Sequence, residues 1–185
     1  MLAHTRVFTG HGTYVEDDTI ISSVAGIPKR TNRFISVESV RHRYRGNIGD
    51  VIVGRIQSVG SKRWLVEMGG NQCGILMLSS VVLPGGEQRR RTSTDQLQMR
   101  ELFEEGDVVS AEIQNFFHDG TTALHTRSVK YGKLTNGQLI IIPNVLMRRL
   151  KQQFMTLPCG VQVLFGLNGY VWITMLEKDE DITPK

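Results

Sequence analysis

Hydrophobic and polar residues alternate in short runs between residues 49 and 127. Val51 and Val53 begin the first run, and Trp64 begins another that reads WLVEM. Successive side chains of a strand point to opposite faces, so this period of two predicts strands that bury one face against a core. Glycines interrupt the runs where a small, strongly bent sheet needs bulges or tight turns. Five such runs, two of them opened by a Gly-Asp pair, predict a small β-barrel.

The pattern predicts a smaller unit before the barrel. Residues 1–46 contain short apolar runs, and a turn is expected at Lys29 and Arg30 between two short strands. A unit of this size has too little core to stand alone. We therefore expect it to pack on the barrel, which spans residues 47–130, or on another protein.

A third unit is predicted at 137–176, before a polar tail at 177–185. GQLIIIP indicates a strand, and Asn144 follows as the expected N-cap of a helix. The apolar face of that helix would consist of Leu146, Leu150, Phe154 and Leu157. A hairpin then follows, in which Asn168 and Gly169 are expected to supply the positive φ angles of a tight turn.

A basic loop separates the third and fourth predicted strands of the barrel. A capping box, either Thr92 with Asp95 or Ser93 with Gln96, predicts a short helix at 94–104 with an apolar stripe. Three guanidinium groups precede this helix, at Arg89, Arg90 and Arg91. Cations at a helix N-terminus oppose the macrodipole, so local stability does not explain them. A ligand or partner contact is favoured over a solvated charge run.

Other basic residues are candidates for phosphate contacts. Lys62 and Arg63 precede Trp64 at the start of the second predicted strand. Trp64 either stacks on a base or points into the core, and its shared parity with Val66 favours the core. Further candidates are Arg127 and Lys130 in the linker after the barrel, and Arg148 and Arg149 on the polar side of the predicted helix. The basic run 41–45 fits a solvated connector and a phosphate contact equally well.

Composition adds limits to this interpretation. The 185 residues carry a net charge of +4 with a pI of about 9.3, which favours an anionic partner. Cys73 and Cys159 lie far apart, in apolar contexts, and are expected to be buried, inert thiols. No apolar run is long enough to span a bilayer. The histidines and cysteines lack metal-ligand spacing, and no catalytic constellation appears, so neither a metal, a cofactor nor a small-molecule substrate is expected.

The order of the units resembles a known family. The barrel is similar to an S1 domain, a small OB-type barrel that binds single-stranded nucleic acid. The whole chain resembles the RNA exosome cap subunit of the ribosomal-RNA-processing type, which has an N-terminal domain, an S1 domain and a KH domain. The matching segments are GHGTYV at 10–15, SVAGIP at 23–28, GDVIVGRI at 49–56, KRWLVE at 62–67, LPGGEQRRR at 83–91, LHTRSVKYGKL at 124–134 and LPCGVQVLFGLNGYVWI at 157–173.

The resemblance implies a fold class that is mainly β with a smaller α+β part: an N-terminal β unit, a five-stranded S1/OB barrel and a partial KH-like unit. It implies a non-catalytic subunit that binds exosome ring and cap subunits and guides single-stranded RNA to a 3′-to-5′ nuclease, in rRNA maturation and mRNA turnover. The implied locations are the nucleus, the nucleolus and the cytoplasm. An autonomous S1-domain RNA-binding regulator is the alternative.

Two features depart from the family pattern. Gly166, Asn168 and Gly169 match the family's variant of the KH loop, but here the loop joins two strands, which favours a structural turn over a phosphate clamp. The chain also stops soon after Ile173, where the family continues. We therefore expect a C-terminally truncated family member whose last sheet leaves apolar surface exposed.

Overall fold

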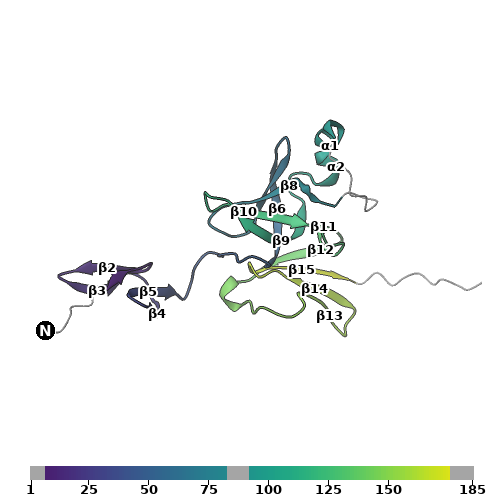
Figure 1. The fold of residues 1–185 in the computed structure, drawn as a ribbon. Helices are drawn as coiled ribbons and strands as arrows, with labels where there is room; N and C mark the ends of the chain where they lie inside the picture. The colour runs from purple at the N-terminus through teal and green to yellow at the C-terminus, as the bar shows by residue number, and fades with distance from the viewer. Residues whose placement is uncertain (1–6, 83–91, 176–185) are drawn as a thin grey trace, which may run out of the picture. The chain divides into compact units, whose positions relative to one another are not determined.

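The computed structural model describes residues 7–82 and 92–175. The chain divides into two compact units, Met1–His42 and Arg43–Lys185. The second contains the barrel and the last sheet (Figure 1). None of the helices within the described ranges has the length and apolar character needed to cross a membrane.

The N-terminal unit is built from short strands with little interior. They are β1 (Phe8–Thr9), β2 (Thr13–Glu16), β3 (Thr19–Ser22), β4 (Gly26–Thr31) and β5 (Phe34–Ser39). The predicted turn at Lys29 and Arg30 is wrong: both residues lie in β4 and pair with β5, and the chain reverses at Asn32, whose φ is 55°. No described side chain of this unit is buried, because so few residues cannot enclose a core.

The five predicted barrel strands are confirmed. They are β6 (Val51–Val59), β7 (Arg63–Glu67), β8 (Gly74–Val81), β9 (Val108–Phe116) and β10 (Thr122–Thr126). The pairing order is β10-β8-β7-β6-β9, and β10 also pairs with β9, which closes the barrel. A further strand, β11 (Gly132–Leu134), extends β9 at the edge. Val66 in β7 and Leu76 in β8 are fully buried, as the period of two predicts. In β6 the expected face is wrong: Ile52 enters the barrel core, and Val53 packs in a second core instead.

The helix predicted at the base of the basic loop is present in two short pieces, α1 (Ser93–Leu97) and α2 (Met99–Leu102). Thr92 and Asp95 form the capping box: the Asp95 amide donates to Thr92 Oγ1 at 3.4 Å, and the Thr92 amide donates to Asp95 Oδ2 at 2.8 Å. Met99 and Phe103 are buried in the barrel core, so the apolar stripe closes one end of the barrel.

The last sheet is antiparallel, in the order β12-β15-β14-β13. Its strands are β12 (Gly137–Ile141), β13 (Phe154–Thr156), β14 (Val161–Phe165) and β15 (Tyr170–Met175). The hairpin β14–β15 is confirmed, but of its turn pair only Gly169 has a positive φ, 87°. Exposed apolar side chains on this unit include Ile141 and Met155, as expected for an incompletely covered sheet.

The helix predicted behind Asn144 is wrong. Only a 3-10 turn, η1 (Asn144–Leu146), forms there, and its N-cap is Pro143 without a side-chain hydrogen bond. Phe154 belongs instead to the edge strand β13, where it pairs with Leu164 and packs in the second core. Strand pairing with β14 satisfies this backbone, so tertiary contacts override the helical periodicity. Leu146 is 69% exposed, which shows that the four predicted positions do not share a buried face.

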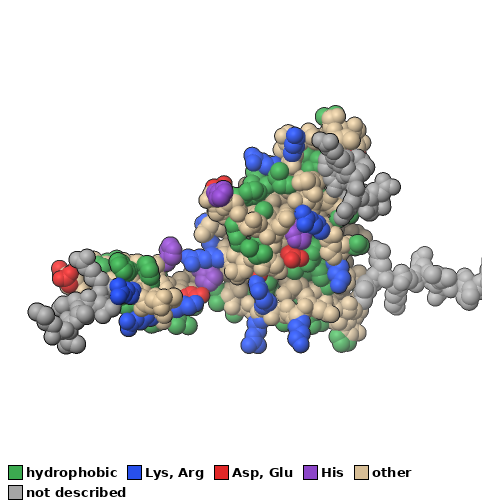
Figure 2. All heavy atoms as spheres, viewed as in Figure 1, with side chains coloured by type: hydrophobic (Ala, Val, Ile, Leu, Met, Phe, Trp, Pro, Cys, Tyr) green, Lys and Arg blue, Asp and Glu red, His purple; other side chains and the backbone are tan. Residues whose placement is uncertain are grey.

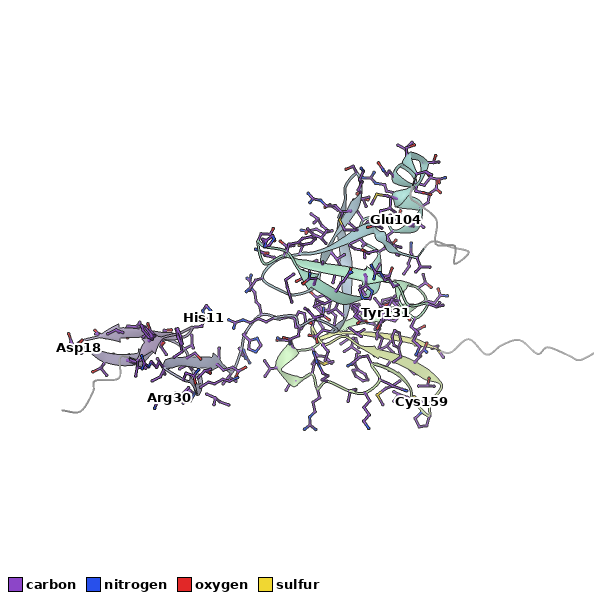
Figure 3. The ribbon with its side chains drawn as sticks, in the orientation of Figure 1. His11, Asp18, Arg30, Glu104, Tyr131 and Cys159 are labelled. Carbon is purple, nitrogen blue, oxygen red and sulfur yellow. The ribbon has the colours of Figure 1, made fainter. Side chains whose placement is uncertain are left out.

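The prediction of two buried thiols is also wrong. Cys73 is half-buried, and its thiol donates to Gln57 Oε1 at 2.8 Å. Burial, with a smaller contribution from the Glu67 charge, raises the Cys73 pKa. Cys159 is exposed in the turn between β13 and β14, where Figure 3 labels it. Its apolar neighbours Leu157 and Pro158 lie in the same turn and are exposed themselves, so they do not cover the thiol.

Candidate nucleic-acid interface

The loop Gly166–Gly169 joins the last sheet to the barrel. Asn168 is 3% exposed, and its side-chain amide donates to Val53 O at 2.7 Å and to Met68 O at 2.9 Å. Its Oδ1 accepts from the Val53 amide at 3.3 Å. A Cβ on Gly166 would lie 2.9 Å from Val53 N, so this close approach requires glycine. The loop is therefore a structural contact, and its buried amide is not available to clamp a phosphate.

A tyrosine and a glutamate strengthen the same interface. The Tyr170 hydroxyl donates to the Glu67 carboxylate, at 2.9 Å from Oε1 and 2.8 Å from Oε2. Glu67 Oε1 also accepts from the Gly69 amide at 2.7 Å. Burial and the Glu67 carboxylate raise the pKa of Tyr170 to about 12. The barrel and the last sheet are thus joined by polar contacts next to the core cluster around Val53, Leu164 and Trp172.

A buried carboxylate fixes the start of the barrel. Asp50 is 2% exposed; it accepts from the Tyr44 hydroxyl at 2.8 Å and from the Asn47 amide at 3.0 Å, and it pairs with Arg149. Burial, and then the hydrogen bond to Asp50, raise the Tyr44 pKa. One guanidinium nitrogen of Arg149 is thus engaged within the fold, whereas Arg148 is simply exposed. The sequence does not reveal this role of Asp50, because the Gly49-Asp50 pair by itself indicates only the start of a strand.

Trp64 does not present its ring to solvent. Its exposure is 0%, its indole nitrogen donates to Phe103 O at 2.9 Å, and the two rings meet edge to face with centroids 5.3 Å apart. The core alternative is confirmed, and Trp64 cannot stack on a base. Parity decided this outcome, because Trp64 shares a face of β7 with the buried Val66. Lys62 and Arg63 are exposed at the turn between β6 and β7.

Topology places Arg127 at the same end of the barrel as Lys62 and Arg63. Strands β8 and β10 are parallel and finish together, with Thr126 beside Val81. Strand β7 starts at Arg63, which pairs with Met77, a residue that precedes Val81 in β8. Arg127 and Lys130 are both exposed. Three of the predicted cationic residues therefore lie around one barrel end, where a phosphate backbone could contact them together.

Beyond Lys130, the chain turns back along the barrel. The Tyr131 hydroxyl donates to Glu112 Oε2 at 3.0 Å, and its ring lies 6.2 Å from that of Phe154, between barrel and last sheet (Figure 3). Burial and Glu112 raise the pKa of Tyr131 to about 12. Burial, the larger cause, and the nearby Arg127 charge lower the pKa of His125. A neutral His125 adds little positive charge to this end of the barrel at neutral pH.

The arginines at 89–91 lie outside the described residues, so their predicted role stays a prediction. On the face shown in Figure 2, Lys and Arg side chains are distributed over several parts of the larger unit and do not form one continuous patch. Within residues 7–82 and 92–175, no group of three His, Cys, Asp or Glu side chains is arranged to hold a metal ion. The exposed Arg127 and Lys130 lie between β10 and β11, whereas the exposed Arg148 lies between η1 and β13.

Two family descriptions match this chain. Residues 43–115 match the description "RRP4, S1 domain", and residues 137–178 match "KH domain". The first match covers barrel strands β6 to β9, and the second covers the whole last sheet.

Full-length relatives agree with these matches. The chain is 49% identical over 179 residues to the mouse exosome complex component RRP4, covering 96% of this chain and 61% of the relative. It is 50% identical over 164 residues to the Saccharomyces cerevisiae exosome complex component RRP4, covering 89% and 46%. An archaeal relative, exosome complex component Rrp4 of Thermococcus kodakarensis, is 25% identical over 182 residues, covering 94% and 68%. The chain thus spans about half to two thirds of the length of these relatives.

A solved crystal structure described as an exosome complex RNA-binding protein has the same fold. Its TM-score is 0.58 at 20% identity, and the alignment covers 75% of this chain and 79% of that one. The same organisation, an S1 barrel followed by a KH-type sheet, is indicated by the family matches, the identities near 50% and the fold. Over its matched residues, this chain is similar to the RRP4 exosome components, with an RRP4-type S1 domain followed by a KH domain.

Proposed function

We propose that the chain is a non-catalytic RNA-binding cap subunit of the RNA exosome. The observation that carries this proposal is the closed S1-type barrel, held to a KH-type sheet by the buried Asn168, in a chain whose relatives are named exosome complex components. Barrels of this type bind single strands through cationic grooves and stacking side chains. Lys62, Arg63 and Arg127 supply positive charge at one barrel end.

The subunit would stabilise the ring and guide single-stranded RNA towards 3′-to-5′ processing and degradation. The proposed pathways are rRNA maturation and mRNA turnover, and the proposed locations are the nucleus, the nucleolus and the cytoplasm. The N-terminal unit provides a suitable docking surface for ring or other cap subunits. It exposes Ile27 at 73%, Val15 at 58% and Phe34 at 55%, apolar side chains that a protein partner would bury.

Affinity purification tests the assembly part of the proposal. The tagged chain is expressed in cells, and the bound proteins are identified by mass spectrometry. We expect exosome ring subunits with the wild-type chain and a strong loss of them with Ile27→Ser. The matched control is Leu97→Ser, which alters an aliphatic residue of α1 that is 87% exposed. Recovery of the wild-type chain without ring subunits contradicts the scaffold role and favours an autonomous RNA-binding regulator.

RNA binding by the free chain tests the second part. We expect the affinity for single-stranded RNA to fall as salt rises, because each neutralised phosphate releases counterions, with a logarithmic slope of about 0.7 per phosphate contact. A double variant, Lys62→Ala with Arg63→Ala, should lower the slope by about 1. A slope near zero for the wild-type chain would contradict a phosphate-binding role. Absence of RNA turnover by the pure chain, with and without divalent metal, is expected for a non-catalytic subunit.

A further inference from the structure

A pocket of about 300 Å³ opens at the barrel end opposite the β6–β7 turn. It lies between the β7–β8 loop, the β9–β10 loop and the segment that leads into β6. These segments meet because β7 and β9 both end there, while β6, β8 and β10 begin. The pocket is separate from Lys62, Arg63 and Arg127, which lie at the other end.

Hydrogen bonds hold the pocket walls in place. Tyr44 forms a bridge with Gly70, and its hydroxyl is bound to the buried Asp50. The Thr121 hydroxyl donates to Gln72 Oε1 at 3.2 Å, which links the two loops across the opening. The Phe117 amide donates to Thr121 O at 2.8 Å and closes the β9–β10 turn. A site built this way loses little conformational entropy when a ligand enters.

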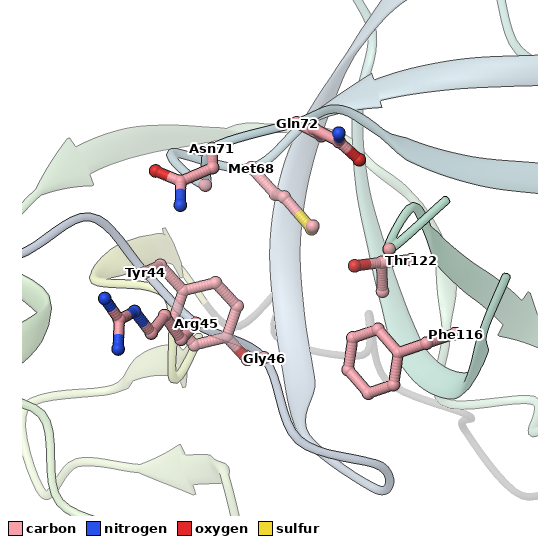
Figure 4. Close-up of a pocket in the computed structure, with 10 residues that line it drawn as sticks. Tyr44, Arg45, Gly46, Met68, Asn71, Gln72, Phe116 and Thr122 are labelled. Carbon is pink, nitrogen blue, oxygen red and sulfur yellow. The ribbon is translucent and has the colours of Figure 1, made fainter. Parts of the chain in front are cut away.

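The side chains around the opening combine three kinds of chemistry. Phe116 is 38% exposed, and Figure 4 shows its ring on the wall opposite Tyr44, with Met68 between them. The amides of Asn71 and Gln72 stand at the upper rim, and each amide offers both donors and acceptors. The guanidinium group of the exposed Arg45 points outward from the rim.

This combination fits a base that stays attached to a phosphate chain. A nucleobase has a flat π-face for a phenyl ring and an edge of mixed donors and acceptors for amides. Its phosphate would lie outside, where a guanidinium can pair with it in a bidentate manner. A purely apolar ligand would make no use of the amide groups, and a free phosphate would make no use of Phe116. The pocket volume lies at the lower end of the range for small-molecule sites, which suits one base.

We propose that this pocket binds one base of single-stranded RNA, stacked on the ring of Phe116. The amides of Asn71 and Gln72 contact the base edge, and Arg45 contacts the adjoining phosphate. The inference rests on the RNA-binding function proposed above and adds a second contact region to it. A strand held at both barrel ends would then run along the outside of the barrel.

The test measures binding of the full chain to a fluorescent uridine oligomer by anisotropy at fixed salt. A strand of equal length and charge in which all nucleotides are abasic is the matched probe. The variants are Phe116→Ala, the conservative Phe116→Tyr, and Phe117→Ala as control, because Phe117 is also exposed, at 43%, but does not line the pocket. Each variant is first checked for a cooperative thermal transition like that of the wild type.

We expect Phe116→Ala to weaken binding of the uridine oligomer by about 5- to 100-fold, the range of one lost base-stacking contact. Phe116→Tyr and Phe117→Ala should stay within about 2-fold of the wild type, and the abasic strand should bind wild type and Phe116→Ala equally. A 4-thiouridine oligomer should cross-link to the peptide that contains residue 116, a readout that needs no variant.

Other results overturn the proposal. One such result is salt-dependent wild-type binding that is unchanged in Phe116→Ala; another is binding that is reduced equally in Phe117→Ala. Either result contradicts base binding by the pocket and leaves the RNA-binding function intact. Cross-linking confined to peptides distant from residue 116 has the same meaning. If the wild-type chain binds neither strand, both base binding by the pocket and the RNA-binding function are contradicted.

Discussion

Replacing Asn168 with alanine should weaken the contact between the last sheet and the barrel and lower the free energy of unfolding. The side chain makes three hydrogen bonds across the interface, two as donor to Val53 O and Met68 O and one as acceptor from Val53 N. At about 1 kcal/mol for each net hydrogen bond, the loss is about 3 kcal/mol. The loss of stability should not be smaller than this, because the variant leaves three backbone groups buried without this hydrogen-bond partner, and each unsatisfied group costs about 1–3 kcal/mol.

Thermal denaturation followed by circular dichroism measures this loss. For a unit of this size, 3 kcal/mol corresponds to a decrease in Tm of about 6–12 °C. The matched control is Asn71→Ala, because Asn71 is exposed and should change stability by less than about 0.5 kcal/mol. A midpoint for Asn168→Ala equal to that of the wild type would refute the claim that this loop holds the two parts together. A second, separate transition would show instead that the sheet unfolds alone once the contact is lost.

Three further results are expected. Trp64→Phe should lose the hydrogen bond to Phe103 O and about 1–3 kcal/mol of stability in denaturation, without weakening RNA binding by the folded protein. The contribution of the Tyr170 hydroxyl to the free energy of unfolding should be fully present below about pH 10 and be lost as pH rises to about 12, because the folded pKa of Tyr170 lies above its usual value of about 10. In alkaline melts, Tyr170→Phe should therefore lose less stability than the wild type. Alanine at all of 89–91 should weaken RNA binding by the assembled complex and lower its salt slope by about 2 while the barrel stays folded; an unchanged affinity would assign these arginines to protein contacts or solubility.

The hydrophobic pattern by itself determined the barrel. Period-two burial places Val66 and Leu76 inside with no help from distant contacts, and the same parity places Trp64 in the core. In β6 the pattern indicates the face of Val53, whereas the barrel core takes Ile52 and the last sheet covers Val53. The sequence also predicted a capping box, because its hydrogen bonds join residues three positions apart, and the structure selects Thr92 with Asp95 from the two alternatives. These features are local, so a sequence window contains everything that fixes them.

Tertiary structure decided the rest. The stretch after Asn144 has helical spacing, yet it becomes a turn and an edge strand, because Phe154 gains a pairing partner on β14 and a place in the second core. The role of Asn168 depends on Val53, which is 115 positions away in the chain. The proposed base pocket likewise forms from two loops and a lead-in segment that meet only when the barrel closes. Contacts between such distant residues leave no periodic signal in the sequence, and so only the folded chain reveals them.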